Sequence, residues 1–287
     1  MKKILITGAN SYIGTSVAKW LLQWPDKFFV DTIDMIDGSW RSKDFSSYDV
    51  VYHVAGIAHV SSKKKMAPLY FKVNRDLAIE TAEKAKREGV KQFIFMSSMI
   101  IYGKDNRIGD HRPIDVTRYA PINAYGKSKL DADLAIQKLA DESFKVVISR
   151  TPVVYGPSSK GNFTRLIMLA RKIPIIPKMS NKRSMIFIDN LAEFIRVVIQ
   201  FDESGVFYPQ NSDYVSVLSV IKETRAMLGL PTIESSIFRI LIIVTSVFMP
   251  RLRKVFGDKY FELCSTEYRN NNYVICDFVS SLNKTLS

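Results

Sequence analysis

The stretch TGANSYIG, from Thr7 to Gly14, follows the apolar run Ile4–Ile6 and precedes a segment with apolar residues at helical spacing. A strand, a turn and a helix in this order expose backbone N–H groups and the positive end of the helix dipole, which together suit a phosphate group. Gly8 allows the tight turn, and Gly14 allows the helix to lie close to the sheet. Ser11 replaces the middle glycine of many such turns, so the motif alone is weak evidence for a dinucleotide site.

The rest of the first two thirds of the chain alternates between short β-branched or aromatic runs and amphipathic segments. The strands are nearly continuously apolar, which indicates burial on both faces and therefore a parallel sheet covered by helices. We expect an α/β fold, a Rossmann-like doubly wound parallel sheet with a smaller C-terminal substrate-binding region. The expected strands are 2–7, 28–34, 50–55, 92–97 and 145–149, and the expected helices are 13–23, 72–88 and 124–141.

A change in character after Gly156 divides the chain. Residues 1–156 are expected to form the dinucleotide-binding domain, with 185–208 returning to it as a strand that leads into a helix capped by Asp189 or Asn190. Residues 157–184 and 209–287 are expected to form the substrate-binding region. Within it, 163–172 has helical spacing, whereas 173–184 is too interrupted by proline to predict a helix or a strand.

An acidic residue closes the second expected strand, twenty residues after Gly14. A carboxylate at this position, Asp34, can accept hydrogen bonds from an adenosine ribose and would repel a 2′-phosphate, so it favours NAD over NADP. Asp37 and Arg41 lie nearby in the sequence, and an arginine suits a 2′-phosphate, so NADP stays open.

A second constellation lies in AYGKSK, where Tyr125 and Lys129 are four residues apart at the start of a helical segment and share one face. A phenol is a poor acid or base at neutral pH unless a nearby cation stabilises its phenolate, and Lys129 is expected to supply that cation. Upstream, Ser97 and Ser98 end a predicted parallel strand, at the edge where doubly wound sheets bind ligands. A serine there can hydrogen-bond the substrate oxygen whose proton Tyr125 exchanges.

Eight pieces of the chain, in order, resemble the extended short-chain dehydrogenase/reductases, in the branch of nucleotide-sugar epimerases, dehydratases and 4-ketoreductases. They are TGANSYIG, VVYHVAG, KVN, FMSSMIIYG, AYGKSK, RTPVVYGP, KGNF and RSMIFIDNLAEF. The resemblance implies a catalytic triad of Ser98, Tyr125 and Lys129, substrate contacts from Ser98, Tyr125, Asn162 and Arg183, and a homodimer. The cofactor-binding residues that it implies are Gly8, Asn10, Ser11, Tyr12, Ile13, Gly14, Asp34, Val54, Ala55, Gly56, Asn74, Tyr125, Lys129, Pro152 and Val154.

The expected reaction is NAD(P)-dependent redox chemistry at C4 of the hexose of a nucleotide sugar, in surface polysaccharide or sugar-nucleotide metabolism. A 4-epimerase and a 4-ketoreductase share these residues, so both stay open; Val153, where UDP-galactose epimerases tend to carry asparagine, weakens the epimerase interpretation. The alternative from another class is a non-catalytic dinucleotide-binding sensor or scaffold with a basic partner-binding surface. An intact Ser98, Tyr125 and Lys129 argue against it.

The bulk composition limits the partners. The 287 residues carry a formal charge of +13, which favours anionic partners, but basic runs such as Lys63–Lys65 are scattered and predict no nucleic-acid site. Cys264 and Cys276 lack metal-ligand spacing, so we expect no metal site. No stretch approaches the ~20 apolar residues that cross a bilayer, and we expect a cytoplasmic protein. Residues 238–254, apolar and then basic, predict a buried helix or helical hairpin, with weak membrane-surface contact as the alternative.

Overall fold

A computed structural model describes residues 1–58, 66–159, 161–264 and 267–287, without the side chains of Asn162, Pro250 and Arg251. The basic run Lys63–Lys65 therefore lies outside the described residues. The chain forms two compact units. Unit 1 comprises Met1–Gly103, Tyr119–Pro152 and Ile188–Pro209, and unit 2 comprises Lys104–Arg118, Val153–Phe187 and Gln210–Ser287. Residues 104–118 thus group with unit 2, whereas the sequence analysis placed them in the dinucleotide-binding domain.

Unit 1 is built on a six-stranded, entirely parallel sheet with the strand order β2-β1-β3-β4-β5-β9. The chain leaves β1 for β2 on one side and then returns to β3 on the other, so the strand order reverses next to β1. In α/β sheets ligands bind at such a reversal, beyond the carboxyl ends of the strands. The strands are β1 (Lys2–Thr7), β2 (Phe28–Ile33), β3 (Val50–His53), β4 (Gln92–Met96), β5 (Lys145–Ser149) and β9 (Gly205–Phe207).

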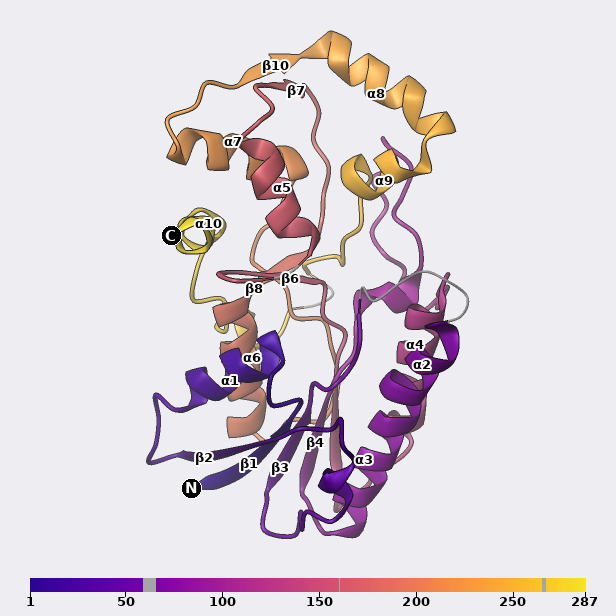
Figure 1. Ribbon diagram of the computed structural model, residues 1–287, viewed down its shortest axis with the longest axis vertical. Coiled ribbons are helices and arrows are strands. Elements are labelled where there is room, and N and C mark those ends of the chain that lie inside the picture. Colours follow the sequence, from indigo (N-terminus) through magenta and orange to yellow (C-terminus); the bar gives the residue numbers. More distant parts are fainter. Residues whose placement is uncertain (59–65, 160, 265–266) are drawn as a thin grey trace. The chain divides into compact units, whose positions relative to one another are not determined.

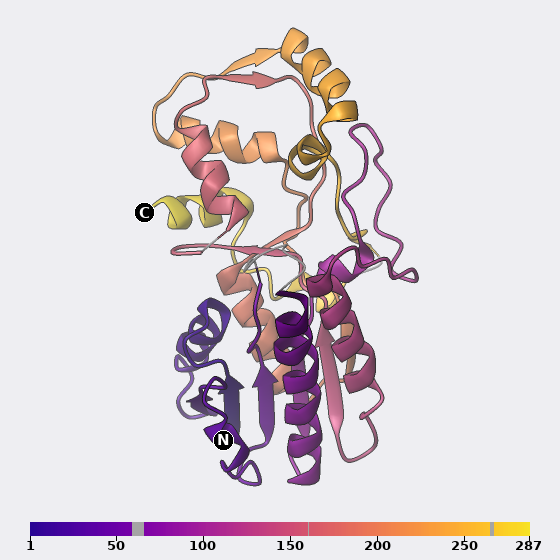
Figure 2. The same ribbon diagram turned by 45° about the vertical axis from the view of Figure 1, so that its right-hand side comes forward.

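Helices cover both faces of this sheet (Figures 1 and 2). On one face α1 (Tyr12–Leu21) packs against α6 (Ile188–Gln200), and on the other α3 (Leu77–Arg87) packs against α4 (Ala124–Gln137). The expected helix at 72–88 is longer than predicted: α2 (Ala67–Phe71) runs through a π-helical turn at Lys72–Asp76 into α3. The predicted fold, a Rossmann-like doubly wound parallel sheet, is confirmed.

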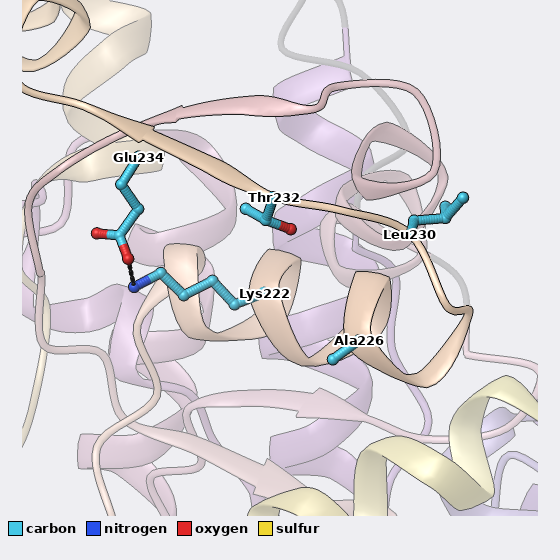
Figure 3. A pocket seen from close by; sticks show the side chains of 5 residues that line it. All are labelled: Lys222, Ala226, Leu230, Thr232 and Glu234. Carbon is cyan, nitrogen blue, oxygen red and sulfur yellow. Dashed lines mark ion pairs between the residues drawn. The ribbon is translucent and has the colours of Figure 1, made fainter.

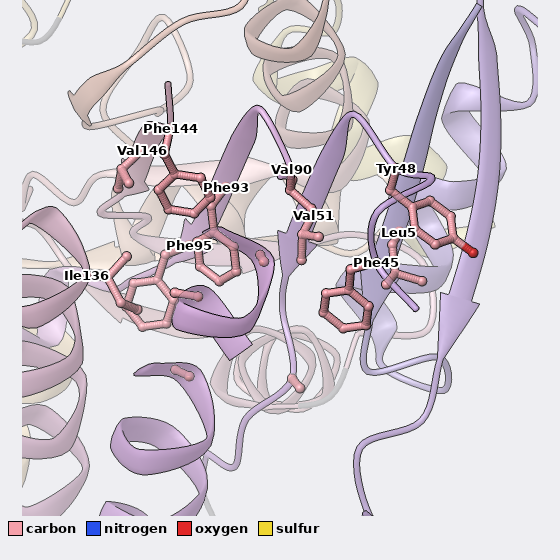
Figure 4. Close-up of a cluster of buried hydrophobic side chains, with 14 of the residues drawn as sticks. Leu5, Phe45, Tyr48, Val51, Val90, Phe93, Phe95, Ile136, Phe144 and Val146 are labelled. Atoms are coloured by element: carbon pink, nitrogen blue, oxygen red, sulfur yellow. The ribbon is translucent and has the colours of Figure 1, made fainter. Parts of the chain in front are cut away.

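The core on the α3 and α4 side of the sheet consists of alternate residues of successive strands. Figure 4 shows Leu5, Val51, Phe93 and Phe95 pointing into this layer, where Ile136 of α4 meets them. All five side chains are fully buried. Burial of such side chains contributes about 1.5–3 kcal/mol each, which fixes the register of the strands whose ends carry the site.

The cap predicted for α6 is wrong. The helix follows β8 (Met185–Phe187) directly from Ile188, so Asp189 and Asn190 already lie in its first turn and neither precedes it as a cap would. An acidic residue in the first turn still interacts favourably with the helix dipole.

Unit 2 contains two small parallel pairs of strands, β6 with β8 and β7 with β10, and five helices among its described residues. Its elements are β6 (Val153–Tyr155), α5 (Asn162–Ala170), β7 (Ile175–Pro177), β8 (Met185–Phe187), α7 (Val217–Met227), β10 (Ile233–Ser235), α8 (Ser236–Phe248), α9 (Pro250–Phe256) and α10 (Phe278–Leu286).

Two expectations for unit 2 are wrong. The proline-rich stretch 173–184 was expected to be neither helix nor strand, yet it contains β7; a two-stranded sheet has only edge strands, and these tolerate proline. The apolar segment was expected to be a buried helix, yet most of α8 is exposed, and only Ile242 and Ser246 are buried. Its expected stop is correct, because α8 ends before Pro250.

Candidate active site

The turn after β1 meets the end of β3 so closely that only glycine fits. Gly8 has φ +82°, and a Cβ built on it would lie 3.1 Å from the Cα and the backbone nitrogen of Ala55. Thr7 and His53 are neighbours in the sheet, which brings Gly8 and the loop that begins at Val54 to the same edge. This cradle lies where the strand order reverses, as a dinucleotide site requires.

Ser11 has a structural role that explains why it can replace glycine. Its side chain caps α1 by accepting a hydrogen bond from the backbone N–H of Gly14, at 3.0 Å. A Cβ on Gly14 would lie 2.6 Å from this oxygen and 3.1 Å from Val54, so the serine and the last glycine depend on each other. The hydroxyl proton of Ser11 is still available as a donor, because the cap uses only the oxygen as an acceptor.

The neighbouring predicted residues differ in their setting. Asn10 is exposed and donates to Asp34 at 3.4 Å, and Ile13 is partly buried in the first turn of α1. The hydroxyl of Tyr12 is buried and has no hydrogen-bond partner among the described residues. Burial, and then the charge of Asp189, raise the pKa of Tyr12 far above its usual value. Tyr12 is thus a neutral phenol whose donor is unused.

The acidic residue after β2 lies beside this turn. Asp34 accepts hydrogen bonds from the side chain of Asn10 and from the backbone N–H of Ile36, at 2.8 Å. Arg41 could have bound the 2′-phosphate of NADP. It donates instead to both carboxylate oxygens of Glu80, and its guanidinium lies 4.7 Å from the centre of the Trp40 ring. This arrangement favours a ribose hydroxyl over a 2′-phosphate beside Asp34.

The side chain of Asn74 holds the loop after β3 by hydrogen bonds to its backbone. Its carboxamide accepts from the N–H of Ile57 at 2.8 Å and donates to the carbonyl of Ile57 at 3.0 Å. A Cβ on Gly56 would lie 2.9 Å from the Asn74 oxygen, so the loop passes tightly over this buried side chain. The amide also reaches Ser128 of α4 at 3.4 Å. Asn74 therefore joins the loop after β3 to the helix that carries Tyr125.

The two serines after β4, Ser97 and Ser98, have different partners. Ser97 is buried and donates to Asp133 at 2.6 Å. Ser98 caps the 3-10 turn Met99–Tyr102 by accepting from the N–H of Ile100, and its hydroxyl lies close enough to Tyr125 to lower the pKa of that phenol. The structure therefore brings Ser98, rather than Ser97, to the phenol.

Tyr125 lies in the first turn of α4, which Asn123 caps through the N–H of Gly126 at 2.8 Å. The side chain is partly exposed, and its ring lies 5.9 Å from the ring of Tyr70. Surrounding protein atoms raise the pKa of Tyr125, and the hydrogen bond from Ser98 lowers it in part. The phenol is thus neutral and close to a second hydroxyl, which suits exchange of a substrate proton.

The ammonium of Lys129 was expected to stabilise the phenolate of Tyr125, but its hydrogen bond goes to a backbone carbonyl instead. This ammonium donates to the carbonyl of Met96 at 2.8 Å and lies 4.7 Å from the centre of the Phe95 ring. Burial lowers the pKa of Lys129 to about 8, and the charge of Asp133 opposes that shift. The ammonium also lies 3.6 Å from where a Cβ on Gly56 would be, so it faces the cofactor loop. An i, i+4 spacing fixes the shared helix face but not which acceptor a long side chain chooses.

A buried ion pair one helical turn beyond Lys129 was not predicted. Asp133, one turn after Lys129, binds the guanidinium of Arg150 at 2.9 Å, and both side chains are almost fully buried. Arg150 also donates to Tyr102 at 2.7 Å and to Tyr119 at 2.9 Å. The spacing Tyr125-Lys129-Asp133 could have indicated a common face, but the partner Arg150 follows another strand.

His53 was expected to be a core histidine, and the structure places it there. It is fully buried, its Nδ1 lies 3.0 Å from the hydroxyl of Thr7, and its ring stacks near Phe93 and Phe95. Burial, with a smaller effect of Lys129, lowers the pKa of His53 to about 3. His53 is therefore neutral at physiological pH and supports the sheet edge.

The remaining candidate residues lie at or beyond the end of unit 1. Pro152 is its buried last residue before β6, and Val154 lies in β6 of unit 2. In unit 2, Asn162 begins α5, and Arg183 pairs with Asp105 at 2.7 Å and donates to the carbonyl of Gly257 at 3.0 Å. Asn162 and Arg183 thus belong to unit 2, whereas Tyr125 belongs to unit 1.

Unit 2 has an open depression of about 300 Å³ between α7 and the segment that leads into β10 (Figure 3). Lys222 and Glu234 form an ion pair across it at 2.5 Å, and Ala226, Leu230 and Thr232 complete its lining. It contains none of the predicted site residues. Among the described residues, no group of three His, Cys, Asp or Glu side chains could hold a metal ion, and both cysteines are free.

Comparisons with known proteins agree with this geometry. Residues 4–209 match the model of the NAD dependent epimerase/dehydratase family. A UDP-glucose 4-epimerase of Vibrio cholerae is 33% identical over 254 residues, which cover 80% of this chain and 77% of the relative. An N-acetyl-alpha-D-glucosaminyl-diphospho-ditrans,octacis-undecaprenol 4-epimerase of Escherichia coli O157:H7 is 26% identical over 219 residues, 70% of this chain and 64% of the relative.

Among solved structures, the UDP-glucuronic acid 4-epimerase of Bacillus cereus in complex with NAD has a similar fold. It has a TM-score of 0.73 and 20% sequence identity, with 98% of this chain and 94% of that chain covered. The chain belongs to the NAD dependent epimerase/dehydratase family. It is therefore an NAD-dependent enzyme of this family, and the alternative of a non-catalytic scaffold is not retained.

Proposed function

We propose that the chain transfers a hydride at C4 of the hexose of a nucleotide sugar, as a 4-epimerase or a 4-ketoreductase. The placement of Ser98 beside Tyr125 carries this proposal: Ser98 follows β4 at the sheet edge that also carries the glycine turn, and its hydroxyl lowers the pKa of the Tyr125 phenol. A serine and a tyrosine in contact can share one substrate oxygen, with one residue holding it and the other exchanging its proton.

The turn after β1 and the residue after β2 support a dinucleotide site. Gly8 has no side chain and lies against the backbone of Ala55, and Asp34 offers a carboxylate beside the turn. When bound, NAD would supply the acceptor and donor of the hydride. The turn at Gly8–Gly14 would hold the diphosphate, Asp34 the adenosine ribose, and Lys129, which faces Gly56, the ribose next to the nicotinamide.

Side chains of the protein would transfer the proton of the C4 hydroxyl. Ser98 would donate to the C4 oxygen and keep it beside Tyr125, which would accept the hydroxyl proton during oxidation and return it during reduction. Lys129 is positively charged below a pKa of about 8 and would favour the phenolate once both groups face the same ribose. Asn162 and Arg183 are proposed to bind the substrate diphosphate, for which Arg183 would exchange part of its pairing with Asp105.

One assay distinguishes the two reactions. Purified protein is incubated with UDP-galactose and NAD, and separately with a UDP-4-ketohexose and NADH or NADPH. A 4-epimerase interconverts the hexoses without net NADH, whereas a 4-ketoreductase consumes reduced cofactor only with the keto sugar. Absence of turnover in both mixtures, with the cofactor bound, would contradict the proposal for these UDP sugars.

The assembly and location of the enzyme are also proposed. We expect a cytoplasmic homodimer in which residues 238–254 make a weak contact with a membrane surface. No helix among the described residues is both long and apolar enough to cross a membrane. A second candidate substrate is a sugar diphosphate carried on a polyprenol. One curated relative is named for such a substrate, and the exposed apolar side of α8 would suit a lipid-linked molecule.

A further inference from the structure

Helix α8 has a stripe of exposed apolar side chains along one side. Its members follow the spacing i, i+3, i+4, i+7, i+10 and i+11, which places them on one face of a helix with 3.6 residues per turn. The opposite side carries the buried Ile242 and Ser246, and the helix contacts β7, so α8 is anchored to unit 2. The members of the α8 stripe are Ile237 (81% exposed), Ile240 (62%), Leu241 (55%), Val244 (55%), Val247 (64%) and Phe248 (82%).

Positive charge lies at both ends of this stripe. The backbone N–H of Lys178 donates to the carbonyl of Ser235, so an exposed lysine adjoins the start of α8. Arg253 and Lys254 follow in α9, after the end of the stripe. No ion pair involves these three side chains in the described part of the chain. Residues 153–187, which include Lys178, carry seven Lys or Arg and no Asp or Glu, and one of the seven, Arg183, is paired with Asp105. Glu234, near the start of α8, is paired with Lys222.

We propose that the α8 stripe inserts into the interfacial region of an anionic lipid membrane, with Lys178, Arg253 and Lys254 against the head groups. A helix of 13 residues is too short to span a bilayer, but an apolar stripe flanked by cations suits one that lies in the interface. A second copy of the chain fits this surface less well, because two basic rims would then face each other. The proposal specifies the membrane contact proposed above, and binding is measured without reference to turnover.

The test is co-sedimentation of the full chain with lipid vesicles. Wild-type protein is expected to sediment with an equal mixture of phosphatidylglycerol and phosphatidylcholine, far less with phosphatidylcholine alone, and less with the mixture as salt is raised. Val244→Glu is expected to weaken binding to the mixed vesicles about tenfold, because it removes an inserted side chain and adds a negative charge. Val279→Glu is the matched control, because Val279 is a 50% exposed valine on α10.

Circular dichroism checks that both variants are folded. If Val244→Glu does not fold, the double variant Arg253→Gln with Lys254→Gln replaces it and is also expected to weaken binding about tenfold. Failure of the wild type to bind the mixed vesicles, or equal losses in Val244→Glu and Val279→Glu, would overturn the proposal. Conversion of a dimer to a monomer by Val244→Glu, without any vesicle binding by the wild type, would instead assign the stripe to a second copy.

Discussion

Replacing Tyr125 with phenylalanine is expected to lower kcat by about 10²–10⁴-fold, the usual contribution of a positioned acid or base. The substitution removes only the hydroxyl beside Ser98, and it leaves the ring that packs near Tyr70. The free energy of unfolding is therefore expected to change by only about 1 kcal/mol, and NAD affinity should stay close to that of the wild type. Steady-state turnover, urea unfolding and NAD titration measure the three quantities.

Tyr70→Phe is the matched control for this prediction. It removes a hydroxyl from the adjacent aromatic ring, which lies in α2 rather than at the end of β4 or the start of α4. We expect a far smaller loss of kcat. If the two variants lose kcat equally, proton exchange cannot be assigned to Tyr125.

The second large effect concerns stability. Asp133→Asn is expected to lower the free energy of unfolding by about 3–5 kcal/mol, because it leaves the guanidinium of Arg150 buried without its counter-charge. Urea unfolding of both proteins measures the difference. Glu80→Gln is the control, since its partner Arg41 is exposed; there we expect a loss of at most about 1 kcal/mol.

Asp133→Asn is also expected to alter the dependence of activity on pH. The charge of Asp133 raises the pKa of Lys129 against the lowering caused by burial, so its removal should move that pKa below about 8. The ammonium would then lose its proton at a lower pH, and the alkaline limb of the activity profile should move in the same direction. An unchanged stability together with an unchanged pH profile would show that the pair neither supports the fold nor acts on Lys129.

The sequence predicted the sheet because its signals are local. Apolar runs, a glycine turn and helical spacing each depend on neighbours along the chain, and they correctly indicated the strands β1 to β5 and the Rossmann-like fold. The same local signals led to the wrong expectation for α8, because an apolar helix that is exposed and one that is buried have the same spacing. The residues 104–118 show the same limit, since their contacts in unit 2 join distant parts of the chain.

The candidate site was predicted in its residue types but not in its contacts. Ser97 and Ser98 are adjacent in the sequence, and only the course of the chain after β4 determines which of them meets Tyr125. The partner of Lys129 is a backbone carbonyl, Met96, that carries no sequence signal. The ion pair between Arg183 and Asp105 joins residues 78 positions apart, so no local sequence pattern indicated it.

The most direct test of the central claim follows one deuterium atom. The protein is loaded with NADH that carries deuterium at both hydrogen positions of the nicotinamide C4 and is supplied with a UDP-4-ketohexose. An epimerase and a reductase both return the hydride to the sugar, so we predict a hexose with deuterium at C4, and almost none from Tyr125→Phe over the same time. A hexose product with only hydrogen at C4 would contradict the account.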